Sequence, residues 1–310
     1  MEWGRWVCIC GHALAVGSLS PRLLPTDETR NDVADTGPMR GRWGRGGSFR
    51  STPLLTLLDL EAHGDDDFDA ISPGEGPGRL YGGQVASQAL RAATLTVDPA
   101  RLPHSLHSYF IRPGRPGIPL NIHVERTRDG GSFSTRTVWA RQQGETIFSL
   151  IASFHGGEAG DDWQPSNMPA VPGPEDIGDS SEGAFARMGS GFDMRPIRRA
   201  EGFRIHPCWV RLNEEIDDDP LLHACALTFI SDRAVVGSAR RPGATDRMAA
   251  ASLDHSIWFH RPVRADQWLL FSVDPVSNFA GRGLALGTFH TETGVLVASI
   301  AQEALLRRPR

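Results

Sequence analysis

The chain has 310 residues, of which 40% are hydrophobic and 22% charged, so it is long enough for two compact units that each bury a core. A formal net charge of −5 and a pI near 6.1 provide no field that gathers polyanions, which argues against a nucleic-acid binder. The four cysteines (Cys8, Cys10, Cys208 and Cys225) are too scattered for a disulfide framework or a common zinc site, so we expect a cytoplasmic setting and no metal or other cofactor.

The first 52 residues are expected to lie outside the folded part as a disordered extension. Residues 25–52 are dominated by Gly, Arg, Ser and Asp and offer few apolar side chains to bury. The apolar stretch at 6–19 follows Arg5 and loosely resembles a secretory signal, but glycines and a histidine interrupt it. Export therefore stays open as the second reading, and Met39 is an alternative start of the chain.

The first folded unit is predicted to span residues 53–155. A turn at Tyr81-Gly82-Gly83 precedes a predicted helix over Gln84–Ala93, where apolar residues recur at helical spacing. Gly and Asp clusters then separate strand-like runs, as hairpin turns do between antiparallel strands. The predicted strands are His104–Arg112, Leu120–Arg128, Phe133–Gln142 and Thr146–Phe154.

A stretch rich in Pro, Gly and acidic residues, 156–200, is predicted to be a linker to a second unit over 201–310. A helix is expected over Leu221–Val236, with Ser231 and Asp232 inside it. The strands predicted after it are Ser252–Arg261, Trp268–Val276, Gly283–Thr291 and Val295–Ala304.

The two units are copies of one plan. The pair Arg112-Pro113 has a twin in Arg261-Pro262, 149 residues later, and both pairs follow a His-Ser strand. Gln84 and Asp232, 148 residues apart, are expected to occupy equivalent places in the two copies. One helix followed by an antiparallel meander is an α+β arrangement, and its tandem repetition predicts a double hotdog fold.

Over residues 53–310 the chain closely resembles the bacterial acyl-CoA thioesterase II family. The motifs that carry the resemblance, in order, are Tyr81-Gly82-Gly83-Gln84-Val85, His107-Ser108-Tyr109-Phe110 with Arg112-Pro113-Gly114, Arg128-Asp129-Gly130-Gly131-Ser132-Phe133-Ser134, and Asp254-His255-Ser256-Ile257-Trp258-Phe259-His260-Arg261-Pro262. The resemblance implies a double hotdog fold and the hydrolysis of fatty acyl-CoA to free fatty acid and coenzyme A.

The resemblance also implies a catalytic Asp, Thr/Ser and Gln set that orders the attacking water. These roles carry over to Asp232, Ser252 and Gln302, all in the second copy. Ser252 departs from the usual Thr but keeps the hydroxyl. The residue types suit the reaction, because a desolvated Asp can accept a proton near neutral pH while a hydroxyl and an amide hold the water.

Further candidates surround this set. Backbone N–H groups near Gly82 and Gly83, at a helix start, could stabilise the oxyanion, and Asp254 is expected to orient the site from the strand face of Ser252. The remaining candidates each have two readings. Arg112, Arg261 and Arg282 either contact the phosphates of coenzyme A or form ion pairs, and His107, His255 and His260 are more readily structural than bases or metal ligands.

Two other functions stay open: an acyl-CoA-binding hotdog protein without hydrolysis, and an enoyl-CoA hydratase that would use an Asp/His pair. The chain has no GxSxG elbow, no GxxxxGK[ST] loop and no GxGxxG turn between a strand and a helix, so serine hydrolase, nucleotide hydrolase and dinucleotide-binding readings lack support. The expected partner is an acyl-CoA substrate, without nucleic acid or membrane. A homo-oligomer and the preferred acyl chain length are left open.

Overall fold

The computed structural model describes residues 52–74, 78–165, 168–177, 191–197, 205–244 and 248–308. The predicted N-terminal extension lies outside the described residues, except for Thr52 at its end. No helix within these ranges is both long and apolar enough to cross a membrane.

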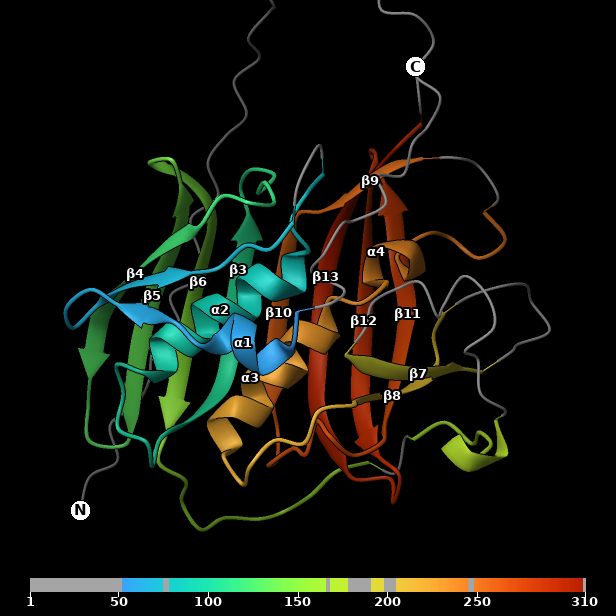
Figure 1. Cartoon of the computed structure of the whole chain (residues 1–310). Helices are drawn as coiled ribbons and strands as arrows, with labels where there is room; N and C mark the ends of the chain where they lie inside the picture. Colours follow the sequence, from blue (N-terminus) through green and yellow to red (C-terminus); the bar gives the residue numbers. More distant parts are fainter. Residues whose placement is uncertain are drawn as a thin grey trace, which may run out of the picture. The chain divides into compact units, whose positions relative to one another are not determined.

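The first half of the fold packs one long helix against an antiparallel sheet (Figure 1). Its helices are α1 (Leu54–Leu58) and α2 (Gly82–Thr94), and its strands are β1 (Glu61–Ala62), β2 (Asp67–Ala70), β3 (Leu102–Phe110), β4 (Leu120–Asp129), β5 (Phe133–Gln142) and β6 (Glu145–His155). Almost all of α2 is buried, including Val85 and Ala89, because its small apolar side chains let the sheet approach closely.

The second half repeats this plan. It comprises the short 3-10 helix η1 (Pro174–Asp176), the helices α3 (Pro220–Ser231) and α4 (Val235–Ser238), and the strands β7 (Phe192–Pro196), β8 (Cys208–Leu212), β9 (Ala249–Ser252), β10 (Asp254–Phe259), β11 (Leu269–Phe279), β12 (Arg282–Thr291) and β13 (Leu296–Arg307). Helix α3 begins where the sequence favours a helix start. Asp219 accepts hydrogen bonds from the N–H groups of Leu221 and Leu222, and Pro220 stands at the first helical position.

All strands belong to one antiparallel sheet that runs through both halves. Their order is β1-β2-β4-β5-β6-β3-β10-β13-β12-β11-β8-β7, with β9 paired to β13. The two halves join where β3 pairs with β10, which places His107 opposite Ser256 and Ser108 opposite His255. The twin His-Ser motifs are therefore neighbours across the centre of the sheet, related by an approximate twofold axis.

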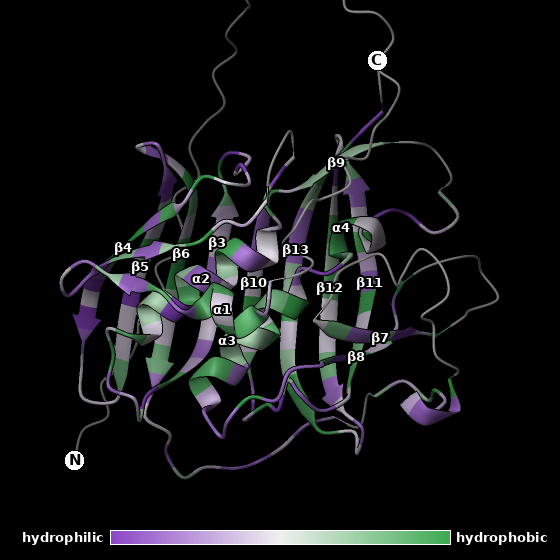
Figure 2. Ribbon diagram, in the orientation of Figure 1, coloured by the Kyte–Doolittle hydropathy of each residue, from purple (hydrophilic) through white to green (hydrophobic). Residues whose placement is uncertain are grey.

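Helices α2 and α3 lie side by side and antiparallel on one face of this sheet (Figure 1). The start of α2 meets the end of α3, and halfway along Ser87 donates a hydrogen bond of 2.7 Å to the carbonyl of Cys225. Figure 2 shows that α3 is largely apolar, in keeping with its burial between α2 and the sheet. Two helices enclosed by one continuous antiparallel sheet form the predicted double hotdog.

The helix predicted over Leu221–Val236 is interrupted. Helix α3 ends at Ser231, Asp232 is its C-cap, and Ala234 adopts a positive φ of 60° before α4 begins. The expected equivalence of Gln84 and Asp232 was wrong, because Gln84 lies in the first turn of α2 whereas Asp232 follows the last turn of α3.

Candidate active site

The carboxylate of Asp232 lies where the two copies meet. Its backbone caps the end of α3, and its side chain reaches the start of α2, where the N–H of Gly83 donates a hydrogen bond of 2.9 Å to Oδ2. The residue is only 7% exposed. A residue of the second copy is thus held by the backbone of the first.

Ser252 and Gln302 converge on the other oxygen of this carboxylate. The hydroxyl of Ser252 donates to Oδ1 of Asp232 at 3.2 Å, and Nε2 of Gln302 donates to the same oxygen at 3.0 Å. Gln302 Nε2 also lies 2.8 Å from the Ser252 hydroxyl oxygen. Ser252 ends β9 opposite Ala304 of β13, and Gln302 lies two residues from Ala304 on the same strand, so the pairing of β9 with β13 brings them together. All three residues selected from the sequence meet at one point.

Burial alters the acidity of this carboxyl. Desolvation raises the pKa of Asp232 to about 6, against the hydrogen bonds from Gln302, Gly83 and Ser252, which favour the charged form. The carboxyl therefore changes charge close to neutral pH. Such a group can hold and release a proton under the conditions in which most enzymes work.

Two glycines allow the helices to approach this closely. A Cβ on Gly82 would lie 2.7 Å from Oδ2 of Asp232, and one on Gly83 would overlap the carbonyl oxygen of Phe229. That carbonyl is itself fixed, since the hydroxyl of Tyr81 donates to it at 2.7 Å. The Tyr81-Gly82-Gly83 motif is thus explained by contact with α3.

His255 is the residue whose role the sequence reasoning missed. The sequence predicted only a structural role for it, whereas its Nδ1 lies 2.7 Å from Oε1 of Gln302 and its Nε2 lies 2.7 Å from the hydroxyl of Ser231. Complete burial lowers the pKa of His255 to about 4, so the ring is neutral near pH 7. The signal was present in the sequence, because His255 alternates with Asp254 and Ser256 on a strand and so faces the interior.

The proton on His255 can be assigned from its partners. Gln302 donates through Nε2 to Asp232 and Ser252, so its Oε1 can only accept, and the proton of the neutral ring must sit on Nδ1. Nε2 of the ring lies 2.7 Å from the hydroxyl of Ser231, which also lies 2.8 Å from the carbonyl oxygen of Thr228. A directed series of hydrogen bonds runs from His255 through Gln302 to Asp232.

Asp254 lies beside this cluster and does not contact Asp232. Its Oδ1 accepts a hydrogen bond of 2.6 Å from the backbone N–H of Glu303, the residue after Gln302. The N–H of Leu253 donates to the carbonyl of the same Glu303. Asp254 thereby ties the start of β10 to the segment of β13 that carries Gln302.

The other candidates from the sequence lie away from the carboxylate. Arg112 donates to the carbonyl of Thr146, Arg261 binds Asp162 and the carbonyl of Leu296, and Arg282 pairs with Glu303 at 2.8 Å. His107 lies 3.0 Å from the hydroxyl of Ser256, and His260 lies 2.8 Å from that of Ser299. These two histidines join neighbouring strands of the sheet.

Comparisons with known proteins match both halves of the chain. A family model described as the acyl-CoA thioesterase N-terminal domain matches residues 72–155, and one described as acyl-CoA thioesterase matches residues 192–305. The chain is 34% identical to acyl-coenzyme A thioesterase 8 of Homo sapiens over 84% of this chain and 91% of that protein.

Solved structures of similar proteins share the fold of this chain. The acyl-CoA thioesterase II TesB2 of Mycobacterium marinum is 39% identical, covers 83% of this chain and 97% of its own, and superposes with a TM-score of 0.72. A hot dog fold protein of Alicyclobacillus acidocaldarius, 19% identical with a TM-score of 0.68 over 83% of this chain and 98% of its own, shares the fold.

Proposed function

The chain belongs to the acyl-CoA thioesterase family and is a thioester hydrolase, and on that premise we propose that it converts fatty acyl-CoA to free fatty acid and coenzyme A by attack of an ordered water. Asp232 is the proposed base, with Ser252 and Gln302 holding it and the water in place. The observation that carries this proposal is the convergence of both side chains on one buried carboxylate.

The hydrogen bonds at Asp232 leave one position for a water. A carboxylate has about four lone-pair positions, two on each oxygen. Ser252 and Gln302 occupy those of Oδ1, and Gly83 occupies one on Oδ2. The remaining position on Oδ2, beside the start of α2, is where we place the attacking water.

The proposed reaction then follows with its atoms balanced. Asp232 takes a proton from the water as the water oxygen bonds to the thioester carbonyl carbon, which leaves a negative charge on the carbonyl oxygen. When the C–S bond breaks, the coenzyme A sulfur leaves with the electron pair and receives the proton from Asp232. The N–H of Gly82, a helix-start donor that the helix itself does not use, is the proposed partner of the oxyanion.

His255 is proposed as a positioning residue for this step. An amide can turn over and exchange its oxygen for its nitrogen, and with that orientation Gln302 would present an acceptor to the Asp232 carboxylate. The Nδ1–H of His255 supports the productive orientation, because it requires an acceptor at the Gln302 oxygen. The neutral state of the ring keeps this arrangement constant near pH 7.

Both alternative functions are less well supported. A non-hydrolytic binder would have no need of a buried carboxylate whose pKa burial raises to about 6. A hydratase would need Asp and His side chains that exchange protons with the substrate, yet Gln302 stands between Asp232 and His255. A cytoplasmic location remains part of the proposal and rests on the scattered cysteines.

The test is a panel of acyl-CoA substrates from short to long chains, with thiol release followed by a chromogenic reagent. Wild type should release thiol from at least one chain length, and Asp232→Asn should lose more than about a hundredfold of kcat. Asp218→Asn, at a side chain that is 97% exposed, is the matched control and should retain full activity. An Asp232→Asn variant as active as wild type would remove the mechanism, and loss of enoyl absorbance without thiol release would favour the hydratase.

A further inference from the structure

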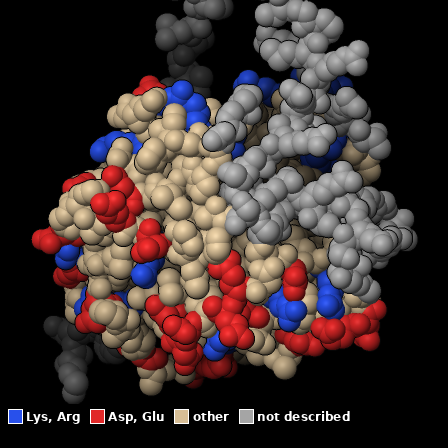
Figure 3. All heavy atoms as spheres, in the orientation of Figure 1, with Lys and Arg blue, Asp and Glu red and all other residues tan. Residues whose placement is uncertain are grey.

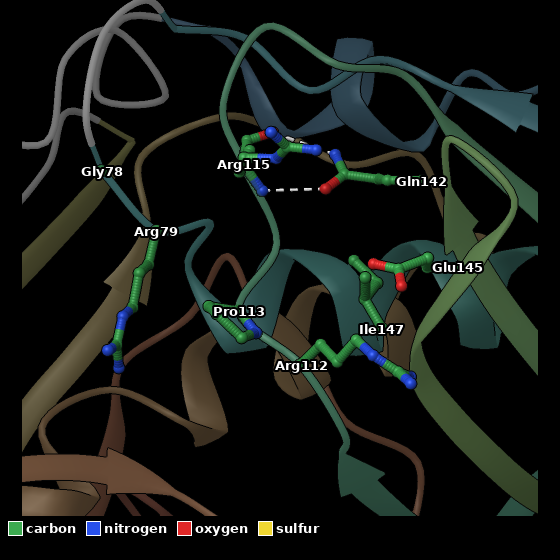
Figure 4. Close-up of a pocket in the computed structure, with 8 residues that line it drawn as sticks. All are labelled: Gly78, Arg79, Arg112, Pro113, Arg115, Gln142, Glu145 and Ile147. Carbon is green, nitrogen blue, oxygen red and sulfur yellow. Dashed lines mark hydrogen bonds between the residues drawn. The ribbon is translucent and has the colours of Figure 1, made fainter. Parts of the chain in front are cut away.

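A cleft of about 360 Å³ opens in the first copy close to the start of α2. Its lining residues are Gly78, Arg79, Arg112, Pro113, Arg115, Gln142, Glu145 and Ile147 (Figure 4). Asp232, Ser252 and Gln302 are not among them, so the cleft is separate from the carboxylate cluster. Three guanidinium groups against one carboxylate give it an excess of positive charge.

The hydrogen-bond partners of the three arginines in the cleft do not neutralise their positive charge. Arg112 donates through Nη1 to the carbonyl of Thr146, and Arg115 donates through Nη2 to the side-chain oxygen of Gln143, both neutral partners. Arg79 is exposed. Among the described residues no salt bridge joins Arg79, Arg112 or Arg115 to a carboxylate. On the face shown in Figure 3 acidic side chains gather along the lower part, so the molecule has no general attraction for anions.

The second copy provides an internal comparison. Arg261 is the twin of Arg112, and each donates through Nη1 to the backbone of the last strand of its own copy, to Leu296 and Thr146 respectively. Arg261 also binds Asp162 through Nε and Nη2, at 3.0 Å and 2.5 Å. An acidic residue from the segment between the copies thus neutralises Arg261, while Arg112 still has Nε and Nη2 for an external anion.

The walls of the cleft are held in place. Gln142 accepts from the N–H of Arg115 at 2.8 Å and donates to its carbonyl at 2.9 Å, which fixes the loop that carries two of the arginines. The N–H of Leu80 donates to the carbonyl of Gly114 at 2.9 Å and joins this loop to the segment of Arg79. Because Leu80 lies two residues before Gly82, the cleft is tied to the helix start that faces Asp232.

We infer that this cleft binds the phosphate groups of the coenzyme A moiety, through Arg112 and Arg115 with Arg79 at its edge. This inference rests on the proposed function, since it assigns the nucleotide end of the same substrate. Guanidinium groups suit phosphate because their planar donors can form two parallel bonds to its oxygens. The single carboxylate, Glu145, opposes binding. The cleft then anchors the polar end of the substrate while the thioester lies beside Asp232.

The test compares acyl-CoA with the acyl-pantetheine of equal chain length, which keeps the thioester but lacks every phosphate. Arg112→Ala and Arg115→Ala should each raise KM for acyl-CoA about tenfold, the effect of losing one charged hydrogen bond. Their kinetics with acyl-pantetheine should match wild type. Glu145→Gln should act in the opposite direction and lower KM for acyl-CoA. Arg126→Ala, which removes an exposed arginine paired with Asp66, is the control.

Calorimetry with coenzyme A as the titrant separates the two proposals. Wild type should bind coenzyme A about tenfold more tightly than Arg112→Ala, and added salt should reduce the difference. If wild type cleaves both thioesters but the arginine variants shift KM equally for both, or for neither, the phosphate assignment is overturned. If wild type cleaves neither thioester, the proposed function fails, and equal binding of coenzyme A by wild type and Arg112→Ala would overturn the cleft as well.

Discussion

The backbone N–H of Gly83 donates a 2.9 Å hydrogen bond to the carboxylate of Asp232, 149 residues further along the chain. The two residues belong to different copies of the repeat, and they meet because α2 and α3 are antiparallel. The sequence placed the Asp, Ser and Gln set in the second copy and named the N–H groups of Gly82 and Gly83 in the first copy as oxyanion donors, whereas in the structure the Gly83 N–H binds the Asp232 carboxylate. The site needs the start of one helix and the end of the other.

Activity should depend on pH through Asp232. Because the ionised carboxylate is the proposed base and burial raises its pKa to about 6, kcat/KM should rise through pH 6 and level off above it. The profile is measured with acyl-pantetheine as well as acyl-CoA, so that ionisation of the substrate phosphates does not contribute. A flat profile between pH 5 and 8 would contradict the assignment of the base.

Stability should depend on pH in the opposite direction. Asp232 binds its proton more tightly in the folded chain, where its pKa is about 6, than in the unfolded chain, where it is near 3.8. Its contribution to stability is therefore full below pH 4 and is lost as pH rises through 6, by up to about 3 kcal/mol. Asparagine does not titrate. Urea unfolding should show that the free energy of unfolding of Asp232→Asn rises relative to that of wild type from pH 4 to 7. A difference between the two proteins that does not change with pH would argue against the raised pKa.

Gly83→Ala should both destabilise the protein and impair the site. The new methyl group would overlap the Phe229 carbonyl, which the Tyr81 hydroxyl holds, so the helices must separate at a cost of about 1–3 kcal/mol. Thermal unfolding and kcat measure the two effects. Gly156→Ala, where a Cβ meets nothing within 4 Å, should leave both unchanged. Wild-type behaviour of Gly83→Ala would show that the close approach is unimportant.

His255→Phe and His255→Asn should differ. Phenylalanine removes the donor to Gln302 Oε1 and should lower kcat by about 10-fold to 100-fold, whereas asparagine can place an N–H near the Nδ1 position and should recover much of the rate. KM should change little in either variant, because His255 is buried away from the substrate. Equal kcat losses in two variants that are equally stable to urea would indicate that the orientation of Gln302 is not the cause.

Ser252 should tolerate the residue that is usual in the family. Ser252→Thr keeps the hydroxyl that donates to Asp232, and we expect its kcat to stay within about threefold of wild type. Ser252→Ala removes that donor and should lower kcat about tenfold. Single-turnover thiol release compares the three proteins directly. If threonine were as damaging as alanine, the shape of the site would outweigh the hydroxyl.

The elements that were predicted well are those with strong local signals. Gly-rich turns bound β5, whose predicted limits Phe133–Gln142 agree with the structure. Strands β1, β2 and β8 were missed, because they are short and take their hydrogen bonds from distant partners such as β4 and β11. β7 (Phe192–Pro196), which pairs with β8, falls inside the range predicted as a linker. A local pattern cannot reveal pairing that depends on the rest of the sheet.

The residues of the candidate site likewise fall into those that the sequence could name and those that only the structure brings together. Asp232, Ser252 and Gln302 could be named because the family resemblance supplied their roles, while their individual sequence contexts are unremarkable. The hydrogen bonds of His255, Ser231 and the backbone N–H of Gly83 depend on which groups the fold brings within reach of one another. The ion pair between Arg261 and Asp162 could not be predicted either, because nothing in the local sequence couples positions that are 99 residues apart.

The junction of β3 with β10 carries an implication for the history of the molecule. A single copy, released from its twin, would expose the edge of β3 and would find the same edge on another such copy to be its natural mate. An association of that kind is symmetric, so every chemical group in it occurs twice. When the two copies are joined in one chain, their sequences can change independently and the symmetry is no longer required. One half is free to keep an acid, Asp232, at the end of its helix where the other has Leu95, and an ancestor with two equal catalytic centres can become an enzyme with a single specialised one.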